Sequence, residues 1–172
     1  MKSFYKTILI CIGYILISTY PTIASGDRLF ESEQPLELIL EADVLTLIED
    51  KSEEPEYTQA SLIQKLPGNA IIMFDLKVKP RGHTRRLSDL CDFPPLKFNL
   101  KKGQTKNTEF DGYDKFKFVS QCRQDQEFQH YVMEEYLLYK TYNILTEESY
   151  KTRLVNLTIN GCLFRRPVND GI

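Results

Sequence analysis

The chain has 172 residues, a length that suits one domain, and its composition is ordinary for a globular protein, with 42% hydrophobic and 27% charged residues. This balance excludes a disordered or fibrous chain. The formal net charge of -2 excludes a globally basic coat for nucleic acids, although it allows a local basic patch.

The first 26 residues are typical of a secretory signal peptide. Lys2 and Lys6 precede the apolar stretch 8–17, and small residues follow around Ala24. An uncleaved membrane anchor is the alternative, since the uncharged stretch 7–26 is long enough to span a membrane, but polar residues and Pro21 interrupt its second half. We therefore expect cleavage and export to the periplasm, cell surface or medium, with membrane contact only through this leader.

Export changes how the cysteines are interpreted, because thiols outside the cytosol tend to pair. After the leader the chain has Cys91, Cys122 and Cys162. Cys91 lies in a loop ahead of one expected strand, and Cys122 lies at the end of a later strand. We predict a disulfide between these two and leave Cys162 unpaired. The cysteines and histidines do not have the usual zinc-ligand spacings, so we expect no metal site.

Alternating and helical patterns predict a sheet with one long helix. Asp43 caps a short helix through Ile48, the segment 126–145 forms a long helix without Gly or Pro, and Asn160-Gly161 is a hairpin signal. In chain order, the expected strands are 35–40, 57–64, 70–79, 96–101, 115–120 and 153–159. The prediction is a single α+β domain over 27–172, an antiparallel sheet of five or six strands with one long packed helix.

Three of these strands alternate between apolar and basic residues. Period-two alternation sends each set to one face of a sheet, so neighbouring strands would share their lysines on one face. These lysines are Lys77, Lys79, Lys97, Lys101, Lys115 and Lys117, with Arg81, Arg85 and Arg86 at the edge. Such a face attracts phosphate groups or acidic polymers. The alternative is a solvated outer face that uses lysine for solubility and edge protection.

Four segments add a family pattern to this alternation. Segments 76–83, 93–100, 114–119 and 154–161 read LKVKPRGH, FPPLKFNL, DKFKFV and LVNLTING, with a helix opening near Tyr131. Their order resembles the amino-terminal part of the CotH-like family, the spore-coat-type atypical kinases and their secreted bacterial relatives. The resemblance covers about residues 36–164, is closest to a secreted Bacteroidetes-type branch, and implies the N-terminal lobe of an atypical kinase-like fold.

Two departures from the family bear on activity. His83 replaces the family's Asn after Arg-Gly, and Cys162 follows Gly161 where the family continues into an aromatic strand and its catalytic half. A kinase needs metal-holding carboxylates and a positioning group, and no such set is visible. We therefore expect an incomplete CotH-like domain that is not a competent kinase by itself, with no assigned catalytic residue. ATP and a divalent metal are implied only for intact relatives, and we expect no cofactor in this chain.

Two functional hypotheses follow, with a degenerate, inactive product as a third possibility. By analogy with intact relatives, Lys77 or Lys79 would contact phosphates and Glu135 would orient that lysine, although Glu135 also fits the polar side of the helix. The other hypothesis is a small exported binding module whose basic face binds anionic glycans or surface polymers. Neither hypothesis includes a nucleic-acid partner.

Overall fold

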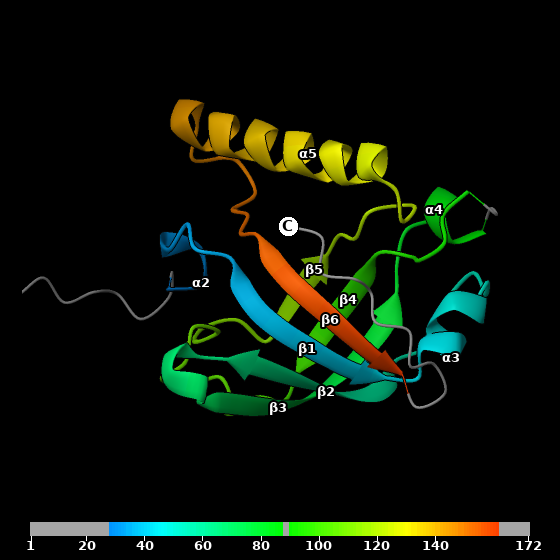
Figure 1. Ribbon diagram of the computed structural model, residues 1–172, viewed down its shortest axis with the longest axis horizontal. Coiled ribbons are helices and arrows are strands. Elements are labelled where there is room, and N and C mark those ends of the chain that lie inside the picture. The colour runs from blue at the N-terminus through cyan, green and yellow to red at the C-terminus, as the bar shows by residue number, and fades with distance from the viewer. Residues whose placement is uncertain (1–27, 88–89, 162–172) are drawn as a thin grey trace, which may run out of the picture.

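The computed structural model describes residues 28–87 and 90–161. The expected signal peptide and Cys162 lie outside these residues. The elements, drawn in Figure 1, are α2 (Arg28–Glu31), β1 (Leu36–Ala42), α3 (Val44–Glu49), β2 (Thr58–Lys65), η1 (Pro67–Asn69), β3 (Ile71–Pro80), α4 (Thr84–Leu87), β4 (Leu96–Leu100), β5 (Lys115–Phe118), α5 (Gln126–Leu145) and β6 (Val155–Gly161). The predicted α+β class is confirmed, with a six-stranded sheet and one long helix.

The strands form one curled sheet in the order β5-β4-β3-β2-β1-β6. Neighbouring strands are antiparallel except β1 and β6, which run parallel from Leu36 opposite Val155 to Ala42 opposite Gly161. The sheet is therefore mixed rather than wholly antiparallel. The hairpin predicted at Asn160-Gly161 is wrong, because both residues belong to β6 and pair with β1.

One face of the sheet carries the hydrophobic core. Its register places Leu40, Leu62 and Phe74 side by side across β1, β2 and β3. The buried apolar strand residues of this face are Leu36, Leu38, Leu40, Ala42, Leu62, Phe74, Leu76, Val78, Pro80, Leu96, Phe98 and Leu100. Leu47 of α3 and Phe110, from the loop between β4 and β5, join this core, and the Phe110 ring lies 5.3 Å from that of Phe74. This burial leaves the opposite face free for polar side chains.

Local capping explains where the two longer helices begin. Asp43 accepts a hydrogen bond of 3.2 Å from the Thr46 N–H, which confirms the predicted cap of α3. Asp125 does the same for α5 through the Phe128 N–H, at 3.1 Å. The bounds of α5 match the predicted 126–145. Neither α2 nor α4 follows from a sequence pattern, because four residues are too few to show a helical period.

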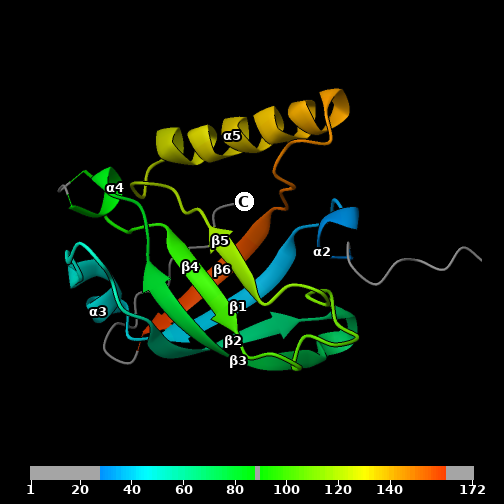
Figure 2. The same ribbon diagram turned by 180° about the vertical axis from the view of Figure 1, so that it is seen from behind.

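Polar contacts connect α5 to the rest of the domain. The helix lies apart from the sheet, on the side of β5 and β6 (Figures 1 and 2), and none of its residues is buried. Tyr136 and Lys140 donate hydrogen bonds of 2.7 and 2.8 Å to the Glu33 carboxylate, just ahead of β1. The bonds from Lys140 and then Tyr136 hold the pKa of Glu33 below its usual value. The apolar residues of α5 therefore remain largely exposed.

The predicted disulfide is confirmed. Cys91 and Cys122 are bonded and lie 31 positions apart in the sequence. The bridge joins the loop ahead of β4 to the segment that follows β5. Beside it, the Asp92 N–H donates a hydrogen bond of 2.8 Å to the Cys122 carbonyl.

A buried glutamine interrupts the apolar face of the sheet. Gln64 is 1% exposed and lies between Leu38 of β1 and Ile72 of β3. Within the described residues, its side-chain oxygen has no hydrogen-bond partner. Burying an unsatisfied amide oxygen costs about 1–3 kcal/mol. The position therefore lowers the stability of the fold.

Replacing Gln64 by leucine is expected to raise the free energy of unfolding by about 1 kcal/mol, because the unpaired acceptor is removed and apolar surface replaces it. Urea unfolding followed by circular dichroism measures the change. Gln59→Leu, at an exposed position of the same strand, is the matched control and should change little. A loss of stability in Gln64→Leu would contradict the argument.

Candidate functional site

The outer face of three adjacent strands carries a cluster of lysines. Alternation along β3, β4 and β5 directs these side chains away from the core, opposite to Val78, Phe98 and Phe116. The cluster, which we call the lysine face, consists of Lys77, Lys79, Lys97, Lys115 and Lys117. The structure thus brings five of the predicted anion-binding residues together on neighbouring strands.

The strand register sets these lysines in two rows. Lys79 lies opposite Lys97, and Lys97 lies opposite Lys117, so one row crosses all three strands. In the next row, Asn99 lies between Lys77 and Lys115. Side chains directly opposite each other on neighbouring strands have Cβ atoms about 5 Å apart, and like charges in this arrangement repel. An anion placed over the rows would relieve that repulsion.

The ammonium groups differ in how they are held. The Lys79 Nζ donates a hydrogen bond of 3.0 Å to the Pro55 carbonyl and lies 4.8 Å from the centre of the Tyr57 ring. The Lys117 Nζ lies 5.2 Å from the centre of the Tyr150 ring. No contact within the described residues neutralises these charges. Lys77, Lys97 and Lys115 have no hydrogen bond or ion pair with another described side chain.

Two further predicted residues border the lysine face. The Lys101 Nζ lies 3.8 Å from the Asp75 carboxylate, and both side chains are exposed. Gln104 donates to the same carboxylate at 2.9 Å. Lys101 is therefore paired, and Asp75 is an acidic residue at the border of the lysine face. Arg81 follows β3, is half-buried, and its backbone N–H donates a hydrogen bond of 2.8 Å to the Pro95 carbonyl.

Arg86, expected at the edge of the basic face, is instead a buried structural residue. It is 3% exposed. Its guanidinium donates to the carbonyls of Gly82 at 3.0 Å and of Ser52, and it also reaches those of Asp50 and Glu53. These acceptors occupy the donors that an anion would need, so Arg86 joins two loops and does not belong to the site.

Glu135 is not joined to the lysine face. It lies on α5, and within the described residues it forms no hydrogen bond or ion pair with Lys77 or Lys79. The Lys79 ammonium is held instead by Pro55 and Tyr57. The described residues therefore show no contact through which Glu135 could orient Lys77 or Lys79. Its neighbour Glu134 contacts His130 at 3.2 Å.

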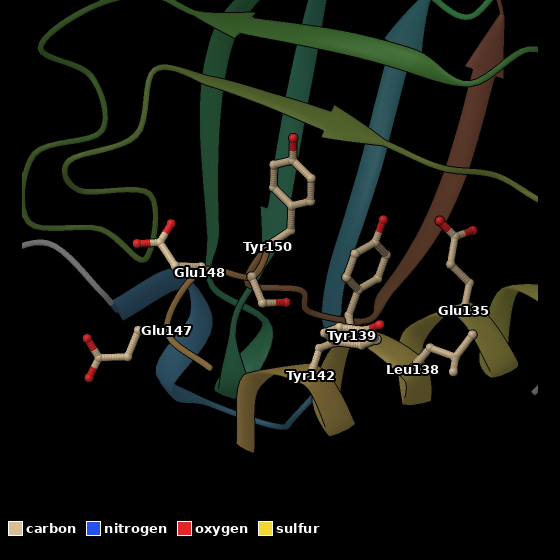
Figure 3. Close-up of a pocket in the computed structure, with 8 residues that line it drawn as sticks. Glu135, Leu138, Tyr139, Tyr142, Glu147, Glu148 and Tyr150 are labelled. Atoms are coloured by element: carbon tan, nitrogen blue, oxygen red, sulfur yellow. The ribbon is translucent and has the colours of Figure 1, made fainter. Parts of the chain in front are cut away.

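Glu135 belongs to a second feature, a cavity of about 650 Å³ at the C-terminal half of α5. We call it the tyrosine pocket, lined by Glu135, Leu138, Tyr139, Tyr142, Glu147, Glu148, Ser149 and Tyr150. The Asn143 side chain donates a hydrogen bond of 3.1 Å to the Tyr150 carbonyl, which folds the segment after α5 back onto the helix. Figure 3 shows Tyr139 and Tyr150 pointing in the same direction, with Glu135 and Glu148 on either side.

The tyrosine pocket was not predicted. Tyr139 and Tyr142 recur at the spacing of apolar residues in a packed helix, whereas Tyr142 is 57% exposed. The available signal was the dense mixture of tyrosine and glutamate from Glu135 to Tyr150. Such a mixture on an exposed surface favours cations over anions.

Among the described residues, no group of three or more His, Cys, Asp or Glu is arranged to hold a metal ion. None of the described helices combines the length and the apolar composition that a membrane span requires. No protein-family model, curated protein or solved structure matches the chain. The resemblance to the CotH-like family therefore stays a prediction, and the functional argument rests on the two surfaces described above.

Proposed function

We propose that this chain is an exported protein that binds an anionic polysaccharide through the lysine face. The observation that carries the proposal is the row in which Lys79, Lys97 and Lys117 are direct neighbours on three adjacent strands. This row concentrates positive charge on a protein whose formal net charge is -2. The proposal assigns no catalytic step to the described residues.

The geometry suits an extended anion better than a small one. The lysine face is a strand surface that spans three strands, and strands in a sheet lie about 4.8 Å apart. A polymer with regularly spaced carboxylates or sulfates can therefore contact several ammonium groups at once. Each contact between one ammonium group and the polymer is weak in water, but several contacts on one chain add up.

The disulfide supports the exported setting. Cys91 and Cys122 are bonded, and disulfides persist in the periplasm, at cell surfaces and outside cells. Anionic polysaccharides suit the lysine face on chemical grounds, since they combine high charge with extended chains. Charge recognition of this kind weakens as salt concentration rises.

Removing three lysines from the face is expected to lower the affinity for dextran sulfate about tenfold or more at low salt, because fewer counterions are released on binding. The variant is Lys77→Gln/Lys97→Gln/Lys115→Gln, which leaves the contacts of Lys79 and Lys117 intact. The slope of log affinity against log salt should also fall, by about one for each lysine removed. Neutral dextran is the ligand control, and calorimetry at several salt concentrations is the measurement.

The matched protein control is Lys51→Gln/Lys65→Gln/Lys106→Gln, which removes the same charge from exposed positions outside the lysine face. It should bind nearly as well as the unchanged protein. An equal loss in both triple variants would mean that binding follows net charge, and the proposal would fall. The proposal would also fall if the folded protein did not bind dextran sulfate at low salt, or if binding required ATP.

A further inference from the structure

The tyrosine pocket has a chemistry opposite to that of the lysine face. Tyr142 is 57% exposed and Tyr150 is 69% exposed, so their rings meet solvent beside the cavity. The rings of Tyr139 and Tyr150 form an edge-to-face pair with centres 6.1 Å apart. The face of an aromatic ring carries negative potential and attracts ammonium groups. The Lys117 ammonium, 5.2 Å from the centre of the Tyr150 ring, is an example within the molecule.

Carboxylates reinforce this potential. Glu135 and Glu148 flank the two upright rings in Figure 3, whereas the Glu147 side chain points away from them. None of the three carboxylates forms an ion pair with a described residue. The pocket therefore places carboxylates that have no ion-pair partner among the described residues next to exposed ring faces and the exposed Leu138 side chain.

We propose that the tyrosine pocket binds an alkylammonium group, with its methyl or methylene groups against Tyr142 and Leu138 and its charge toward Glu135 and Glu148. Aromatic rings recognise such cations because the alkyl groups pack on the ring while the charge interacts with the ring face. The cavity of about 650 Å³ has the volume of a small-molecule site. This site adjoins the lysine face, since the Lys117 ammonium lies 5.2 Å from the centre of the Tyr150 ring, but it does not depend on the function proposed for that face.

The test compares a cation with its neutral isostere. Choline and 3,3-dimethyl-1-butanol have nearly the same shape, but only choline is charged. We expect choline to shift the NMR signals of Tyr139, Tyr142 and Tyr150 and to bind about tenfold more tightly than the alcohol. Equal binding of the two compounds, or no shift at these tyrosines, would overturn the proposal.

A second pair of ligands distinguishes the source of the cation. Nα-acetyl-lysine methylamide carries the ammonium of a polypeptide side chain, and its Nε-acetylated form lacks the charge. Tighter binding of the lysine compound than of choline would identify a lysine side chain as the ligand. The reverse order would identify a quaternary ammonium compound. If neither cation bound more tightly than its neutral counterpart, the proposed site would be excluded.

Two variants locate the binding within the pocket. Tyr142→Leu removes one ring but keeps an apolar side chain, and Glu148→Gln removes one flanking charge. Each should weaken choline binding about threefold or more. Glu147→Gln is the matched control, since it removes the same charge from the neighbouring side chain that points away from the rings. Equal losses in Glu147→Gln and Glu148→Gln would contradict the geometry, and the circular dichroism spectrum of each variant provides a separate check of folding.

Discussion

Replacing Arg86 by methionine is expected to lower the free energy of unfolding by about 3 kcal/mol, because a buried guanidinium is removed from several backbone acceptors at once. Arg86 is 3% exposed. It donates a hydrogen bond of 3.0 Å to the Gly82 carbonyl and contacts three carbonyls of the segment from Asp50 to Glu53. Methionine fills similar space but supplies no donor, so these acceptors lose their partners while the apolar volume is largely kept.

Two further variants separate this hydrogen bonding from charge alone. Arg86→Lys keeps the charge but not the planar set of donors, so it should lose about half as much stability. Arg85→Met is the matched control, because the Arg85 side chain forms no hydrogen bond or ion pair with a described residue and Arg85 is half-buried; its effect should stay within about 0.5 kcal/mol. Urea unfolding measures all three. A change at Arg86→Met as small as that at Arg85→Met would contradict the proposed role in joining the two loops.

The local parts of the fold could be predicted because nearby residues determine them. Asp43 begins α3 through its own side chain, and apolar residues that recur at helical spacing between Phe128 and Tyr142 indicate α5. Strand alternation predicted the lysine face for the same reason, since Lys97 and Phe98 must point to opposite sides of one strand. In each case the physical cause lies within a few residues.

The parts that were missed depend on distant segments. Asn160 and Gly161 have hairpin chemistry, but their partners are Glu41 and Ala42, more than a hundred positions away on the free edge of β1. Parallel pairing of this kind has no local signal. The apolar face of β6 lies beside that of β1, and this burial takes precedence over the turn preference of the two residues.

Among the functional residues too, local sequence patterns do not predict contacts that depend on distant segments. Nothing local distinguishes Arg86 from Arg85, because the acceptors of Arg86 around Ser52 lie more than thirty positions earlier. The tyrosines of α5 have the spacing of a packed helix, yet Tyr142 is exposed. Spacing predicts which side chains share a face of a helix, but it does not predict whether that face meets the sheet or the solvent.

Removing the disulfide is expected to lower the free energy of unfolding by about 3–4 kcal/mol, since the chain-entropy model assigns this value to a closed loop of 31 positions. The variant is Cys91→Ala/Cys122→Ala in a Cys162→Ser background, which prevents thiol exchange. Native contacts beside the bridge should still form, among them the Arg123 Nε to Leu90 carbonyl hydrogen bond of 2.9 Å. The variant should therefore fold, with a lower urea midpoint.

Reduction supplies the control for this prediction. The Cys162→Ser protein in excess dithiothreitol should unfold at nearly the same urea concentration as the double alanine variant, because both lack the cross-link in the unfolded state. The double variant itself should not respond to the reductant. A difference below about 1 kcal/mol between the oxidised and reduced protein would mean that the bridge adds little to stability. In that case the contacts around Cys122, rather than the closed loop, would hold β5 and the loop ahead of β4 together.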